Sequence, residues 1–130
     1  MLKLILGEDR SRPINVLCLG CHSDDIEIGC GGTILQLIKD YPGVKFYWVV
    51  FSAIGVRKAE AERACKLFVD PGHLQEMDLK EFPDGFMPFQ GAEVKAAFAV
   101  SPAPDYASLR ADIGAYFGED RIGDAADRIR

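Results

Sequence analysis

One short segment gathers most of the chemically reactive side chains of this chain. His22, Asp24, Asp25 and Glu27 follow one another closely, directly after an apolar run. A histidine nitrogen and a carboxylate oxygen are both good zinc ligands, and a catalytic zinc uses three protein ligands and a water. His22 and Asp25 are three residues apart, so on a turn their side chains can converge on one ion. Asp24 lies between them, and we expect it to face the bound water and accept its proton.

Two other interpretations of this segment stay open. The first is a turn rich in aspartate that merely caps the following helix. The second is a small structural metal site made by Cys21, His22 and Cys30, for which a fourth ligand is lacking. Cys18 and Cys21 also form a CxxC pair. Because Cys18 falls inside a predicted strand, we expect a buried, reduced thiol there and no redox centre.

The apolar run Ile14 to Gly20 is typical of a strand buried on both faces of a parallel sheet. Further strands are predicted over 44–52 and 73–79, and helices over 33–40, 57–68 and 91–100. Residues 21–32 are predicted to be a polar loop, and residues 81–90 another loop. This order predicts a doubly wound, Rossmann-like α/β fold, a parallel sheet with flanking helices. Ligands bind beyond the carboxyl ends of such strands, where His22 lies.

The two central helices show apolar faces at helical spacing. The first helix is predicted to bury Ile34, Leu35, Leu37 and Ile38. The second is predicted to bury Ala61, Ala64, Cys65 and Phe68.

The string CLGCHSDDIEIGCGGTILQLI resembles the opening motif of the PIG-L/LmbE-like N-deacetylase family, in which His-Pro-Asp-Asp precedes a Gly-Gly-Thr at the first helix. The matching positions are His22, Asp24, Asp25, Gly31, Gly32 and Thr33. Ser23 replaces the usual proline and removes no ligand. The resemblance continues through RKAEAERACKLF and FPDGFMPFQGAEVK, and it covers roughly residues 14–98.

The resemblance implies a zinc-dependent hydrolase that removes an acetyl group from an N-acetylated sugar or related small molecule. It implies His22 and Asp25 as zinc ligands and Asp24 as the general base. Arg57 would contact the substrate, and a solvated arginine at a helix start is the alternative for it. We expect Gly31 and its neighbour Gly32 to serve close backbone packing and the start of the helix.

The family takes its third zinc ligand and a second histidine from a histidine-rich motif after a fourth strand. The only other histidine here, His73, precedes the third strand, so we expect it at the opposite edge from His22. Asp84 follows the third strand and lies on the correct edge, although a turn at Pro83-Asp84-Gly85 is its more ordinary role. The third metal ligand therefore stays unknown, and a catalytically incomplete fragment of such an enzyme is the alternative function.

Length and composition set the remaining expectations. The resemblance implies that residues 1–100 form the amino-terminal part of a deacetylase-like α/β domain, and we expect 101–130 to be an atypical tail, left by truncation or a frame shift or disordered. The net charge of −5 and the lack of a basic stripe argue against nucleic acid. No apolar run reaches the roughly 20 residues of a membrane span, so we expect a cytoplasmic protein. Without a fourth strand, Ile14 to Gly20 would be a bare sheet edge through which copies of the chain self-associate.

Overall fold

The computed structural model describes residue 6 and residues 13–99 of the 130-residue chain. Its elements are β1 (Asn15–His22), α1 (Asp25–Asp40), β2 (Lys45–Ser52), α2 (Val56–Phe68), β3 (Leu74–Leu79), the 3-10 helix η1 (Asp84–Phe89) and α3 (Gly91–Ala99). The predicted order of strands and helices is confirmed, and the limits of each strand agree with prediction to within about two residues. The predicted tail, 101–130, lies outside the described residues.

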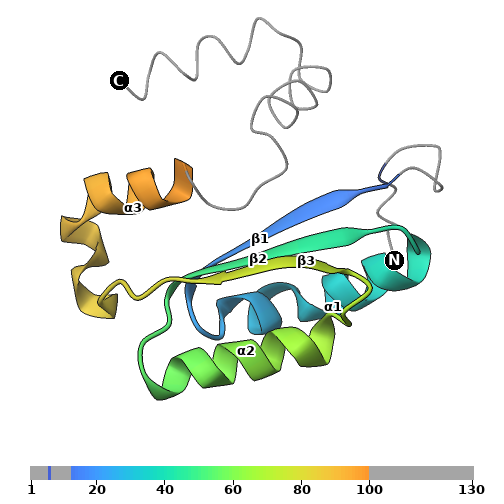
Figure 1. The fold of residues 1–130 in the computed structure, drawn as a ribbon, viewed down its shortest axis with the longest axis horizontal. Helices are drawn as coiled ribbons and strands as arrows, with labels where there is room; N and C mark the ends of the chain where they lie inside the picture. The colour runs from blue at the N-terminus through green and yellow to red at the C-terminus, as the bar shows by residue number, and fades with distance from the viewer. Residues whose placement is uncertain (1–5, 7–12, 100–130) are drawn as a thin grey trace, which may run out of the picture.

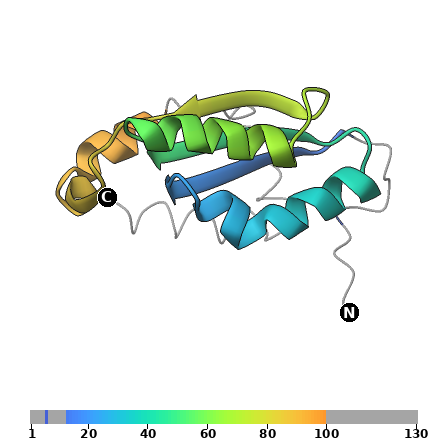
Figure 2. The ribbon, with the colours of Figure 1, turned by 90° about the horizontal axis from the view of Figure 1, so that it is seen from below.

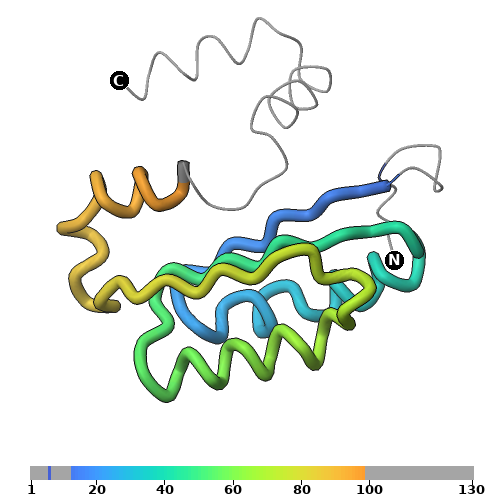
Figure 3. Tube along the Cα trace, viewed as in Figure 1, coloured from blue at the N-terminus to red at the C-terminus, as the bar shows by residue number. Residues whose placement is uncertain are grey.

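The three strands form an open parallel sheet in the order β1-β2-β3, with β2 in the centre (Figure 1). Helices α1 and α2 lie side by side on one face of this sheet (Figure 2). The chain therefore has an α/β fold, as predicted. The chain leaves all three strands at the same end of the sheet, as the trace in Figure 3 shows. The segments that follow β1, β2 and β3 consequently meet at the carboxyl end of the sheet.

The main core lies between the sheet and the two helices. β2 contributes Phe46, Trp48 and Val50, whose period of two sends them to the same face of the sheet. Ile34 on α1 and Cys65 on α2 pack against them from the helices. All five side chains are almost fully buried. Burial on this scale stabilises the fold by about 1.5–3 kcal/mol for each large apolar side chain, and it fixes β2 as the rigid centre of the sheet.

Helix α1 begins at Asp25, well before the predicted start at residue 33, so the predicted loop over 21–32 was wrong for most of its length. Ile26 is 2% exposed and belongs to the core. Cys30 and Ile34 follow it at four-residue intervals, which is helical spacing. Three glycines in this stretch lower its intrinsic helix propensity and conceal that period in the sequence. Packing against the sheet outweighs the propensity.

The predicted apolar faces are correct in part. On α1, Ile34 and Leu37 are buried, whereas Leu35 is 51% exposed, so its predicted burial was wrong. On α2, Ala61 and Cys65 are buried, and Ala64 and Phe68 are half-buried.

The segment after β3 was predicted to be a loop, but Asp84–Phe89 forms the 3-10 helix η1, and α3 contacts it. Within the described ranges, no helix is long and apolar enough to cross a membrane.

Candidate functional site

A cleft of about 500 Å³ opens at the edge of the sheet where the three strands end. Its volume lies in the range of small-molecule sites. Its lining comes from the ends of β1 and β2, the segments that follow them and the start of η1: His22, Asp24, Ser52, Ile54, Arg57 and Asp84. The predicted candidates His22, Asp24 and Arg57 thus meet in one cleft. Asp25, the other predicted ligand, is not part of the lining.

The imidazole of His22 stands between two carboxylates. Its Nε2 lies 2.7 Å from Oδ1 of Asp84, and its Nδ1 lies 3.5 Å from Oδ2 of Asp25. The same Asp25 oxygen accepts a hydrogen bond of 2.9 Å from the backbone N–H of His22. The two ring nitrogens of His22 therefore face two different carboxylates, Nδ1 that of Asp25 and Nε2 that of Asp84.

The carboxylate of Asp24 does not cap helix α1. Asp24 is the N-cap residue of α1, yet its side chain makes no capping hydrogen bond. The turn is instead held by Asp25, whose carboxylate bonds backwards to the His22 backbone. Asp24 lines the cleft, where its carboxylate is available to a bound molecule. The hydrogen bond that the capping interpretation requires of the Asp24 side chain is therefore not made.

A set of contacts at the end of β2 directs the chain after β3 towards the cleft. Glu81 forms a β-bridge with Ser52, and the N–H of Phe82 donates to the carbonyl of Phe51 at 3.0 Å. The rings of Phe51 and Phe82 lie 6.3 Å apart between centroids. Two residues further on, η1 begins with Asp84. The position of Asp84 is thus set by the backbone of the central strand.

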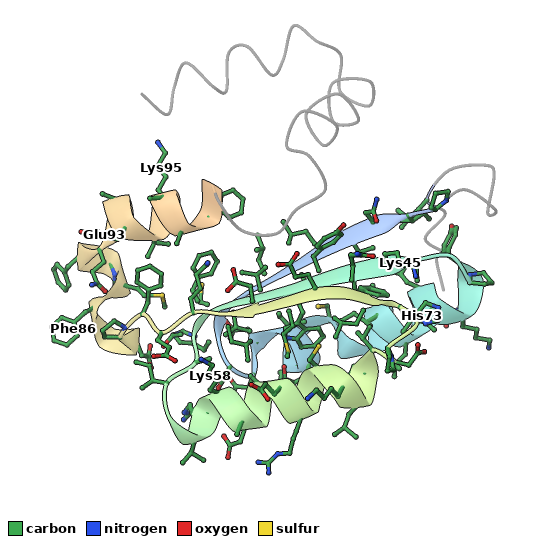
Figure 4. The ribbon with its side chains drawn as sticks, in the orientation of Figure 1. Lys45, Lys58, His73, Phe86, Glu93 and Lys95 are labelled. Atoms are coloured by element: carbon green, nitrogen blue, oxygen red, sulfur yellow. The ribbon has the colours of Figure 1, made fainter. Side chains whose placement is uncertain are left out.

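An ion pair adds to this anchoring. Nζ of Lys58, in the first turn of α2, lies 2.8 Å from Oε1 of Glu81. The hydrogen bond and charge of Lys58 lower the pKa of Glu81, and Glu81 raises the pKa of Lys58. Figure 4 shows Lys58 and Phe86 of η1 towards one end of the sheet and His73 near the other.

His73 is a structural residue at the edge opposite His22, as its place before β3 predicted. Its Nδ1 lies 2.8 Å from Oδ2 of Asp70, and its Nε2 lies 3.2 Å from the carbonyl of Pro42. The hydrogen bond from His73 lowers the pKa of Asp70. Both ring nitrogens of His73 are engaged in holding two loops together.

The cysteines do not gather around His22. Cys18 and Cys65 are buried, and burial raises the pKa of their thiols to about 12 and about 11. Cys18 is therefore the buried, free thiol that was predicted. Cys30 donates its thiol to the carbonyl of Ile26, on the helix side of the sheet. Cys21 is exposed, and strand alternation puts it on the face opposite Cys18. The Cys21–His22–Cys30 metal site is therefore disfavoured.

Glu27, the last acid of the sequence cluster, is not among the residues that line the cleft. Burial raises the pKa of its carboxyl, and its Oε2 has no hydrogen-bond partner among the residues described. It lies near Cys30 and Cys65, whose thiol pKa values it raises. Glu27 thus lies between the carboxylates of Asp24 and Asp25 and the thiols of Cys30 and Cys65 in its electrostatic contacts.

The donors at His22 match a zinc site only in part. Two ligands at 2.0–2.1 Å from a tetrahedral zinc are about 3.3 Å apart. Nδ1 of His22 and Oδ2 of Asp25, at 3.5 Å, come close to that separation. Across residues 13–99, however, no group of three His, Cys, Asp or Glu side chains is arranged to hold a metal ion. The described chain offers two donors for zinc, and the third stays unassigned.

Sequence reasoning missed Ser52 and Ile54 and left Asp84 as a turn residue. All three follow or end a strand at the carboxyl edge of the sheet, which is the signal that could have found them. Comparison with known proteins assigns no family, since no family model, no curated protein and no solved structure matches this chain.

Proposed function

We propose that this chain carries part of the site of a zinc-dependent hydrolase that removes an acetyl group from an N-acetylated sugar or related small molecule. The observation that carries the proposal is the meeting of His22, Asp24 and Arg57 in one cleft at the carboxyl edge of a parallel sheet. These are residues of the motifs that resemble the PIG-L/LmbE-like deacetylases. The pair of His22 and Asp25 donors at near-tetrahedral separation supports it further.

Hydrolysis of an acetamide requires an activated water, stabilisation of the oxyanion and an acid for the leaving amine. Zinc, when bound, lowers the pKa of water and polarises the acetyl carbonyl. His22 and Asp25 would hold the ion. Asp24, whose carboxylate makes no capping bond, would accept the proton of the attacking water. Arg57 would offer its guanidinium to polar groups of the substrate, for which its planar fork of donors is suited.

The complete architecture that we propose is a doubly wound, Rossmann-like sheet. In that arrangement the first strand is central and a second half of the sheet continues beside it. Among the residues described, β1 pairs with β2 alone. A second half next to β1 would supply the third ligand and the acid for the leaving amine. The alternative, a catalytically incomplete fragment, has the same site without those two groups.

Zinc titration by calorimetry tests the proposal directly. The full chain should bind zinc, and both His22→Ala and Asp25→Ala should abolish that binding because each removes one of two donors. His73→Ala is the matched control, since His73 is a histidine with an acidic partner at the far edge. It should bind zinc as the parent chain does.

Acetate release from an N-acetylated amino sugar is the second measurement. With two protein ligands, we expect release to depend on zinc and to stay far below about 1 s⁻¹, the lower end of typical enzyme rates. Zinc binding that survives in His22→Ala and Asp25→Ala, or acetate release independent of zinc, would refute the proposed function. A rate of 1 s⁻¹ or more would instead show that this chain supplies the missing groups itself.

A further inference from the structure

We propose that Ser52 is a substrate-binding residue of the cleft, whose hydroxyl donates a hydrogen bond to the acetamide carbonyl of the ligand. The inference deepens the proposed function and rests on it for the choice of ligand. The structural observation beneath it, a buried serine whose hydroxyl opens into the cleft, does not depend on a metal ion.

Ser52 combines burial with an unused hydrogen-bonding group. The residue is 7% exposed, and it lines the cleft. Among the residues that the structure describes, its hydroxyl has no hydrogen-bond partner. The Ser52 oxygen is nevertheless not one of the buried polar atoms left without a partner, so it meets the open space of the cleft. A hydroxyl held in this way is available to a molecule bound in the cleft.

The backbone of Ser52 is held from both sides. In the sheet Ser52 pairs with His22 of β1, and on its other side it forms the antiparallel bridge with Glu81. The N–H of the next residue, Ala53, donates to the carbonyl of Lys80 at 2.9 Å. Neighbouring strands lie about 4.8 Å apart, and paired residues point to the same face of the sheet. The Ser52 hydroxyl is therefore fixed beside the imidazole of His22.

The lining of the cleft offers few other donors. Its two aspartates, Asp24 and Asp84, only accept hydrogen bonds when they are ionised. The ring nitrogens of His22 both face carboxylates. The Ser52 hydroxyl and the Arg57 guanidinium are therefore the donors of the lining that are left for an acceptor on a ligand.

The positions of these two donors give them different roles. Arg57 is exposed and lies in the first turn of α2, whereas Ser52 is buried beside His22. An acetamide that reacts next to His22 presents its carbonyl oxygen to Ser52, and Arg57 is left for more distant polar groups. A fixed donor at a carbonyl oxygen also stabilises the negative charge that develops there during hydrolysis.

NMR titration of the metal-free chain with N-acetylglucosamine and with glucose tests this contact. The two sugars share a pyranose ring, and glucose has a hydroxyl in place of the acetamide. Ser52→Ala should weaken N-acetylglucosamine binding by roughly 2–10-fold, the effect of one neutral hydrogen bond, and leave glucose binding unchanged. Ser52→Thr keeps the hydroxyl and should bind as the parent chain does.

Ser23→Ala is the matched control. Ser23 is the other buried polar residue of the described chain, at 4% exposed, but it does not line the cleft. Its loss should leave the binding of both sugars unchanged. Urea unfolding separates binding from a structural role: because the Ser52 hydroxyl has no partner in the described chain, Ser52→Ala should be at least as stable as the parent.

Equal N-acetylglucosamine affinity in the parent and Ser52→Ala would overturn the inference, as would an equal loss for glucose. A parent chain that does not distinguish the two sugars, or a loss of binding in Ser52→Ala accompanied by a clear loss of stability, would overturn it as well. None of these results touches the proposed function if zinc still binds at His22 and Asp25. A parent chain that binds no zinc but keeps the Ser52-dependent preference would refute the proposed function alone.

Discussion

Gly31 on α1 faces the ring of Phe68 on α2 so closely that a methyl group on Gly31 would lie 2.5 Å from Cε1 of Phe68. Non-bonded carbon atoms do not approach to that distance. A side chain at this position would therefore displace the Phe68 ring or push the two helices apart. Gly31 therefore leaves room for the Phe68 ring where α1 packs against α2.

Gly31→Ala should destabilise the fold. Overpacking at a well-packed contact costs about 1–3 kcal/mol, and only about 1 kcal/mol of that is offset by the better helix propensity of alanine. Gly32→Ala is the control, because nothing lies within 4 Å of its added Cβ. Gly32→Ala should be neutral or stabilising by up to about 1 kcal/mol. Urea unfolding followed by circular dichroism measures both.

A double variant isolates the contact. In a Phe68→Leu background the ring atoms that meet the new methyl group are gone, so the added cost of Gly31→Ala should largely disappear. Equal stability of Gly31→Ala and Gly32→Ala in the parent background would show that the helices yield without cost. Gly31 packs closely, as expected, although its neighbour is the Phe68 ring, whereas nothing lies near the Cβ position of Gly32. The expectation that both glycines start the helix was wrong, because α1 begins at Asp25.

The general-base assignment predicts a separation of two effects. Asp24→Asn should leave zinc affinity nearly unchanged. The Asp24 carboxylate takes part in neither the His22–Asp25 contact nor the His22–Asp84 contact. It should reduce zinc-dependent acetate release by roughly 10² or more, the usual scale for loss of a general base. The two assays are calorimetry and acetate detection on one preparation. A parallel loss of zinc binding and hydrolysis would make Asp24 a ligand instead.

Much of this arrangement follows from local sequence pattern, and the rest depends on tertiary contacts. The β-branched and aromatic run of β2 predicts a buried strand because such residues fit a sheet covered on its faces. The start of α1 could not be predicted in the same way. Gly29, Gly31 and Gly32 penalise a helix locally, and only the partner ring of Phe68 gives Gly31 its purpose.

The candidate site likewise combines residues that the local sequence brings together with one that a tertiary contact brings in. His22, Asp24 and Asp25 are neighbours in sequence, so their spacing alone brings them together. Asp84 is more than 60 residues away, and its turn chemistry is that of any Pro-Asp-Gly segment. Its approach to His22 depends on the antiparallel bridge between Glu81 and Ser52, which no local pattern encodes.

The buried thiols predict a fall in stability at high pH. Burial raises the pKa of Cys18 to about 12 and that of Cys65 to about 11, against about 8.5 in an unfolded chain. Between those values the unfolded chain loses the two protons while the folded chain keeps them. The free energy of unfolding therefore decreases as the pH rises above about 9, by up to about 1.4 kcal/mol per pH unit for each thiol.

Urea unfolding at pH 8 and pH 10 measures this slope. Cys65→Ala should show a smaller loss between the two pH values than the parent chain, because one of the two buried protons is gone. Cys21→Ser is the control, since Cys21 is exposed, and its slope should equal that of the parent. Identical slopes in all three proteins would mean that the thiol of Cys65 ionises as freely in the folded chain as in the unfolded one.

The final prediction concerns β1, which is an edge strand within the described part of the sheet, as the absence of a fourth predicted strand implied. Its outer backbone groups form a template for pairing with another chain, and its exposed Leu19 adds apolar surface. We expect the chain to self-associate at concentrations on the order of 100 µM, where exposed edges drive aggregation. Light scattering coupled to gel filtration measures the mass of the species formed.

A charge on the edge strand should reverse this behaviour, because strand pairing would bring identical charges together and bury them. Leu19→Lys is therefore expected to shift the population towards the monomer. Leu67→Lys places the same charge on an exposed leucine of α2, away from the edge, and should leave the self-association unchanged. If the parent chain is a monomer that unfolds cooperatively, β1 is already covered or needs no partner. Equal responses of the two lysine variants would trace the effect to net charge and not to the edge of the sheet.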